Sequence, residues 1–203
     1  SLAKEMVETG TGEVVSVSNN ISIDDIGQSL QNILANKVEE LKQTVSMMDE
    51  TNLKEILTII KNAKSVQFAA VGNTIPVAID GAFKLNQIGI PAISGTIWET
   101  QIGYTYNLTD KDAVIVISNS GESREMITLM KAAKEVGAIT IAITNNEQST
   151  IAKASNYHIT TATREKLFLD GYCFSRVSAT TVIEILYLFL TSMDKNCLLY
   201  TSD

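Results

Sequence analysis

Three serines and a glycine stand together directly after an apolar run. Residues 113–117 are all alanine, valine or isoleucine, and Ser118, Ser120, Gly121 and Ser123 follow them. The run predicts a buried parallel strand, and the residues after 123 have helical periodicity. The first N–H groups of a helix lack intrahelical partners and carry partial positive charge, so they can hold an anion. Serine hydroxyls add donors, and a glycine lets the backbone approach. The segment predicts a phosphate-binding loop without lysine.

A plainer interpretation of the same residues stays open. Ser120 can be a helix N-cap, with Ser118 and Ser123 as ordinary turn residues. Position favours binding, because ligands of open α/β sheets lie beyond the carboxyl ends of the strands. We therefore include Asn119, which lies between the serines, among the expected ligand contacts.

A second turn of this kind follows the first predicted strand. It contains Gly72, Asn73 and Thr74, and Pro76 after them suits the first position of a helix. Two such turns at one sheet edge can hold the two ends of one small ligand. The turn matches neither GxGxxG nor a Walker loop, so nothing in it indicates a nucleotide.

Short apolar runs alternate with helical segments from residue 65 onward. This alternation predicts a parallel sheet with right-handed crossovers, and hence a three-layer α/β/α sandwich. The expected strands are 66–71, 91–94, 113–117, 138–143 and 157–159. The expected helices are 76–88, 98–106, 122–136, 149–155 and 172–192.

The first part of the chain differs from the rest. Residues 1–21 open with what looks like the end of a helix and continue as a Gly/Thr/Ser/Val/Asn stretch, which predicts a linker from an upstream domain; the main domain then covers 22–203. A long amphipathic helix is expected over 24–47, with a second around Leu53 to Ile60. The apolar stripe of the long helix contains Ile26, Leu30, Ile33, Leu34, Val38, Leu41 and Val45.

Composition excludes several classes of protein. The chain has 203 residues, 45% of them hydrophobic, and a net charge of −7, which opposes nucleic-acid binding by this chain alone. The longest apolar run, 185–190, is far too short to span a bilayer, so we expect a cytoplasmic protein. Cys173 and Cys197 have no metal-ligand spacing and are expected to be buried thiols, so no metal or cofactor is indicated.

The serine-rich segment resembles a family signature. Residues 118–123 are similar to the Ser-x-Ser-Gly-x-Ser/Thr motif of SIS (sugar isomerase) domains, which bind phosphosugars. The resemblance covers about residues 50–192, and continues in Gly72 and in the Lys-Leu pair at Lys84. It implies a sheet order 2-1-3-4-5 and a phosphate at the three serines, with Thr74 where the family usually has serine. Ala70 departs from the glycine that usually precedes the first turn.

Within that family, the flanks resemble RpiR-type transcriptional regulators. The joining segment at 2–6 and a Ser-Arg pair at Ser175 and Arg176 are similar to theirs. The resemblance implies an effector-binding domain that controls DNA binding by a helix-turn-helix domain outside this chain.

An isomerase of the same family is the competing interpretation, and it needs an acid and a base. The catalytic glutamate of the related synthase is replaced by Gln87, and His158 falls inside the last predicted strand, where a structural role is expected. Lys84 is expected to be an amphipathic helix residue. Glu165 follows that strand and is included among the expected ligand contacts. An isomerase or deglycase would need Glu165, Glu122 or Glu125 as base. Trp98 and Glu99 can flank a sugar or lie in an interface.

The predicted function is therefore phosphosugar sensing without turnover. A purely structural dimerisation module is a third interpretation, and it predicts no ligand. We expect a homodimer or homotetramer, because the apolar residues of helices 24–47 and 172–192 exceed what one sheet face needs.

Overall fold

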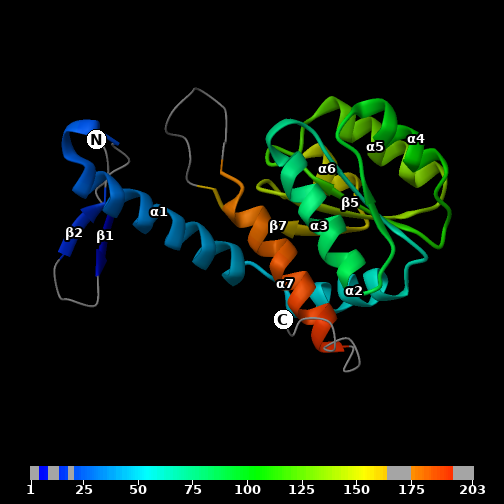
Figure 1. Ribbon diagram of the computed structural model, residues 1–203, viewed down its shortest axis with the longest axis horizontal. Coiled ribbons are helices and arrows are strands. Elements are labelled where there is room, and N and C mark those ends of the chain that lie inside the picture. Colours follow the sequence, from blue (N-terminus) through cyan, green and yellow to red (C-terminus); the bar gives the residue numbers. More distant parts are fainter. Residues whose placement is uncertain (1–4, 9–13, 18–20, 164–174, 194–203) are drawn as a thin grey trace.

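A five-stranded parallel sheet forms the centre of the molecule (Figure 1). The computed structural model describes residues 5–8, 14–17, 21–163 and 175–193. The strand order is β4-β3-β5-β6-β7, which confirms the expected order 2-1-3-4-5. The strands are β3 (Val66–Ala70), β4 (Ala92–Ser94), β5 (Ala113–Ile117), β6 (Ile139–Thr144) and β7 (Tyr157–Thr160).

Helices cover both faces of the sheet, so the predicted three-layer architecture is confirmed. The layer-forming helices are α2 (Glu50–Asn62), α3 (Ile75–Gln87), α4 (Trp98–Tyr106), α5 (Arg124–Glu135), α6 (Thr150–Ala154) and α7 (Val177–Met193). Side chains of α2, α3 and α7 pack on one face, and those of α4, α5 and α6 pack on the other. Each strand was expected within about two residues of its observed bounds.

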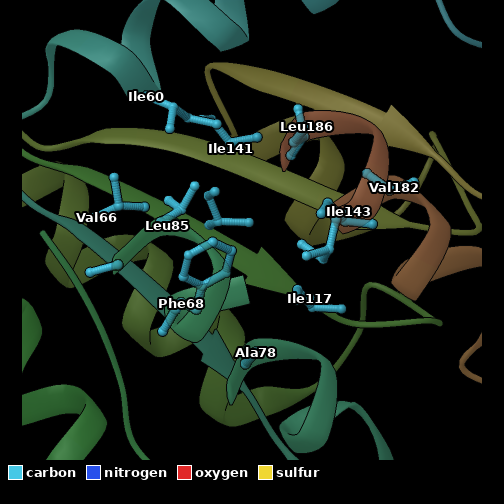
Figure 2. Packing of buried hydrophobic residues seen from close by; sticks show 14 of the residues in the cluster. Ile60, Val66, Phe68, Ala78, Leu85, Ile117, Ile141, Ile143, Val182 and Leu186 are labelled. Atoms are coloured by element: carbon cyan, nitrogen blue, oxygen red, sulfur yellow. The ribbon is translucent and has the colours of Figure 1, made fainter. Parts of the chain in front are cut away.

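Alternation along the central strands divides the core in two. On β5, Ile115 and Ile117 face the α2–α3–α7 layer, whereas Val114 and Val116 face the α4–α5–α6 layer. Figure 2 shows the first of these layers, where Phe68 lies among the isoleucines of the strands. Because helices cover both faces of the sheet, the central strands carry apolar residues on both sides. These short apolar runs are what made the strands recognisable in the sequence.

The N-terminal residues correct one expectation. The sequence predicts the end of a helix at Glu5 and Met6, but these residues lie in β1 (Glu5–Glu8), which pairs antiparallel with β2 (Val14–Val17). In the sequence, five residues rich in Gly and Thr, 9–13, separate these two segments, and such a spacing favours a hairpin. The assignment of 1–21 to an interdomain linker stays a prediction.

The long helix α1 (Ile26–Ser46) follows a short 3₁₀ turn, η1 (Ile23–Asp25), and lies within the expected 24–47. Its N-cap is Asp25, whose carboxylate accepts a hydrogen bond from the Gln28 N–H at 3.0 Å. The helix packs on α7 through a polar face and leaves its apolar stripe exposed. In the described ranges no helix has the length and apolar character needed to cross a membrane.

Candidate functional site

An open cavity of about 660 Å³ lies at the carboxyl ends of β3, β5 and β6. The turns after these three strands supply its walls, as expected for an open parallel sheet. The lining residues are Val71, Asn73, Thr74, Ser118, Asn119, Ser120, Glu122, Ser123, Asn145 and Asn146. Most of the side chains that line the cavity are therefore hydroxyls or amides.

The turn between β5 and α5 forms one wall of the cavity. Ser118 is buried, and its hydroxyl accepts a hydrogen bond from the Gly121 N–H at 3.2 Å and shares another with the Ser123 hydroxyl at 3.1 Å. The Ser120 hydroxyl accepts from the Glu122 N–H at 3.2 Å. Ser123, and not Ser120, is the N-cap of α5, and it makes no side-chain capping bond with a described residue. The first N–H groups of α5 are thus left to a ligand or to water.

The hydroxyl hydrogens of this turn can be assigned from these bonds. Ser120 uses only its oxygen, so its hydroxyl hydrogen is available. Between Ser118 and Ser123, one hydroxyl donates to the other, which leaves one further hydrogen. The turn therefore offers two hydroxyl donors beside the helix N-terminus.

Gly121 holds this turn against the start of α6. Its φ of +69° is in the region that favours glycine, and an added Cβ would collide with the Ser149 side chain. The Gly121 carbonyl accepts from the Ile151 N–H at 3.1 Å. Glu122 reinforces the contact, because its Oε1 accepts from the Thr150 N–H at 2.8 Å. This hydrogen bond lowers the pKa of the Glu122 carboxyl, which stays ionised at the rim of the cavity.

The turn after β3 forms the opposite wall. Gly72 begins a 3₁₀ turn, η2 (Gly72–Thr74), with a φ of +59°. Thr74 is buried, and its hydroxyl lies 3.0 Å from the Val71 carbonyl and 3.1 Å from the Ile117 carbonyl. Its one hydrogen is directed at these carbonyls, so Thr74 joins the ends of β3 and β5 and shapes the cavity.

Four lining residues are not among the expected ligand contacts: Val71, Glu122, Asn145 and Asn146. Asn145 and Asn146 follow β6, and the Asn145 N–H donates to the Asn119 carbonyl at 2.8 Å, which joins the second and third turns. In the sequence they looked like an ordinary turn. Their position after a buried strand, at the same edge as the other two turns, was the available signal.

The structure brings six of the nine expected contact residues to the cavity. Asn73, Thr74, Ser118, Asn119, Ser120 and Ser123 line it, whereas Gly72 and Gly121 set the turn geometry without lining it. Glu165, Cys173 and Cys197 lie outside the described residues.

Six other residues considered in the sequence do not line the cavity: His158, Lys84, Gln87, Trp98, Glu99 and Glu125. His158 is half-buried, with Nε2 2.9 Å from the Thr144 hydroxyl. Burial lowers the pKa of the His158 imidazole, and the charge of Glu147 opposes this in part. The Lys84 amine forms an ion pair with Asp80 at 2.8 Å, one helical turn away on α3. Over the described ranges, no three His, Cys, Asp or Glu side chains gather as metal ligands would.

The strand order and the serine-lined turn between β5 and α5 are together typical of one family of protein domains. Residues 59–189 match the family model of the SIS domain, and the chain belongs to that family. The family resemblance expected from the serine motif is confirmed.

Three proteins are similar to this chain over most of its length. An uncharacterized HTH-type transcriptional regulator of Caldanaerobacter subterraneus is 29% identical over 175 residues; the match covers 86% of this chain and 62% of that relative. The RpiR transcription factor from Sphaerobacter thermophilus (sugar isomerase domain) has a TM-score of 0.77 at 23% identity, covering 84% of this chain and 93% of that one. The Vibrio vulnificus NanR protein complexed with ManNAc-6P also has a TM-score of 0.77, at 21% identity, covering 86% and 66%.

Proposed function

We propose that this chain is the effector-binding domain of an RpiR-type transcriptional regulator and binds a phosphorylated sugar in the cavity beyond β3, β5 and β6. Binding would control a helix-turn-helix domain outside residues 1–203. The observation that carries the proposal is the turn at 118–123, where two hydroxyl hydrogens and the N-terminus of α5 converge. The similarity to an HTH-type regulator and the ManNAc-6P bound to NanR support it.

The cavity has the chemistry that a sugar phosphate needs. The phosphate would lie against Ser120, the Ser118–Ser123 pair and the first N–H groups of α5. The amide side chains of Asn119, Asn145 and Asn146 would face the sugar, because amides both donate to and accept from hydroxyl groups. The ligand would thus span the turns after all three strands.

Substitution of Ser120 by aspartate tests the phosphate site. Ser120 is exposed, so the change should leave the fold intact while it sets a carboxylate against the ligand phosphate. Calorimetric titration with a panel of sugar phosphates that includes ManNAc-6P should show binding to the wild type and a loss of at least about tenfold in affinity in Ser120→Asp. Equal affinities in the two proteins would contradict the assignment.

The control adds the same charge elsewhere. Thr58 is an exposed hydroxyl residue on α2, away from the cavity, and Thr58→Asp should bind as the wild type does. Urea unfolding of all three proteins checks that any loss of binding is not a loss of structure.

We also propose that the domain does not isomerise its ligand. Of the described residues that line the cavity, Glu122 is the one carboxylate, and its Oε1 already accepts from the Thr150 N–H. Aldose–ketose isomerisation needs a base beside C2. NMR in deuterated water with hexose and pentose phosphates should show no protein-dependent exchange at C2. Exchange that disappears in Glu122→Gln or Glu165→Gln would favour the isomerase or deglycase alternative.

The same proposal includes a cytoplasmic homodimer or homotetramer, since a sugar-phosphate sensor that controls paired DNA-binding domains works as a symmetric assembly. A purely structural dimerisation module would assemble too, but would bind no sugar phosphate in the titration above.

A further inference from the structure

Helix α1 carries the reverse of the usual amphipathic pattern, because its inward face is polar and its outward face apolar. The buried residues are Ser29, Asn32, Asn36, Glu40 and Thr44. The outward residues are 37% to 82% exposed, and we call them the α1 stripe: Ile23, Ile26, Leu30, Ile33, Leu34, Val38 and Val45. A helix in water normally shows the opposite arrangement.

Hydrogen bonds fix this orientation of α1. The Lys37 amine donates to the Ser175 hydroxyl at 2.9 Å and pairs with Glu40 at 3.2 Å. Near the other end, the Thr44 hydroxyl accepts from the Ala162 N–H at 2.9 Å. Rotation of the α1 stripe toward α7 would break these bonds. The stripe therefore stays on the outer face of α1, where a partner can cover it.

The size of the α1 stripe fits an oligomer interface. The exposed fractions correspond to roughly 700 Å² of apolar residue surface, above the largest patch of about 300–600 Å² on a typical monomer. Two such stripes facing each other would bury about 1,400 Å², within the range of specific protein interfaces. A second copy of the chain always carries a matching stripe, so the interface can be isologous.

We propose that α1 pairs antiparallel with α1 of a second copy of this chain, through the α1 stripe, with Leu34 near the two-fold axis. Figure 1 shows α1 extending away from the sheet domain, where a second helix can lie along it. The pairing specifies the surface of the proposed homo-oligomer and does not depend on sugar-phosphate binding.

Charge selects the antiparallel orientation. Asp24 and Asp25 precede α1, and Lys42 is exposed near its C-terminal end. An antiparallel pair places the acidic end of each α1 beside the end that carries Lys42 in the second copy. A parallel pair would instead bring the two acidic ends together.

Sedimentation velocity at micromolar concentration tests the interface. The wild type should be a dimer or a higher oligomer of dimers, and Leu30→Lys/Leu34→Lys should raise the dissociation constant at least about 100-fold, since four lysines would be buried per pair. The control Gln28→Lys/Asn35→Lys adds the same charge on the far side of α1 and should assemble as the wild type does. Because the stripe is exposed in the monomer, both variants should keep wild-type circular dichroism.

Disulfide trapping tests the orientation, in a background with Cys173→Ser and Cys197→Ser. Antiparallel helices bring position 34 against itself but hold the two copies of position 23 far apart. Leu34→Cys should therefore oxidise to a covalent dimer, whereas Ile23→Cys should not.

Each outcome decides a separate point. A monomeric wild type would overturn both the assembly and the pairing. An oligomer unaffected by the lysine pair at 30 and 34 would overturn the pairing alone, since another surface would then hold the copies together. Trapping at position 23 would show parallel helices and overturn the antiparallel geometry. Loss of ligand binding in Ser120→Asp is a separate result and bears on none of these.

Discussion

Two glycines at the cavity have similar backbone angles but different surroundings. Gly72 and Gly121 both have positive φ, and a Cβ would meet open space at Gly72 but the Ser149 side chain at Gly121. At Gly72 only the backbone conformation opposes a side chain, whereas at Gly121 both conformation and packing do. Substitution of each glycine can therefore measure the two contributions to the free energy of unfolding.

Alanine at the two positions should have unequal effects on stability. Gly72→Ala should lower the free energy of unfolding by about 1–2 kcal/mol, the cost of a left-handed L-residue. Gly121→Ala should lower it by a further 1–3 kcal/mol, roughly, because Ser149 must move. Urea denaturation of both variants measures the difference. Equal losses would mean that the contact between Gly121 and Ser149 is not important for stability.

His158 should make stability depend on pH. Its pKa in the folded protein is below the ordinary value of 6.5, because burial disfavours the charged form. The unfolded chain then binds the proton more readily, so stability is full above about pH 6.5 and falls as pH decreases toward the folded pKa. His158→Gln, which can still donate to Thr144, should remove this dependence.

Urea midpoints of the two proteins at about pH 8, 6.5 and 5 measure the effect. Carboxyl groups with lowered pKa, such as those of Asp112 and Glu122, contribute equally to both proteins and cancel in the comparison. Parallel pH profiles would show that His158 does not contribute.

Among the elements, α4 is joined to the end of β3 by the Gln101 side chain. β4 covers only the first residues of β3, and beyond it the Gln101 amide takes the place of a strand. Its Oε1 accepts from the Ala70 N–H at 2.9 Å, and its Nε2 donates to the Ala70 carbonyl at 2.8 Å. Because Ala70 directly precedes the first turn of the cavity, this pair of bonds also supports the site.

Gln101→Leu should destabilise the domain strongly. The Ala70 N–H and carbonyl would remain buried without partners, at about 1–3 kcal/mol for each group. Gln148→Leu, at an exposed position, should change the free energy of unfolding by less than about 0.5 kcal/mol. Chemical denaturation of the two variants is the measurement, and similar values for both would refute the role of Gln101.

The elements also show what the sequence could predict. The five buried strands were expected because strands covered on both faces carry short, continuous apolar runs. The serine turn was expected because a buried strand, a glycine and a helix start occur in immediate succession. Periodicity revealed the apolar stripe of α1 but not which face the helix buries, since that depends on partners such as Ser175 and Ala162. Asn145 and Asn146 resembled any polar turn, and only the sheet places them in the cavity.

At the scale of the whole molecule, charge sets a limit on partners. The chain carries 23 acidic and 16 basic residues, so its field should repel the phosphate backbone of DNA. A gel-shift assay at low salt with residues 1–203 should show no complex. A shift that disappears with added salt would contradict the interpretation that DNA is bound by another domain.

The cavity has a consequence for hydrogen exchange, because its walls come from three turns far apart in the chain. The turns near residues 72, 118 and 145 are joined by the Thr74 hydroxyl and by the bond from Asn145 to Asn119. A ligand that contacts all three would act as an additional cross-link, closing two long loops at once. Slower amide exchange should then appear together in all three turns on saturation, while exchange in the distant helix α2 stays unchanged.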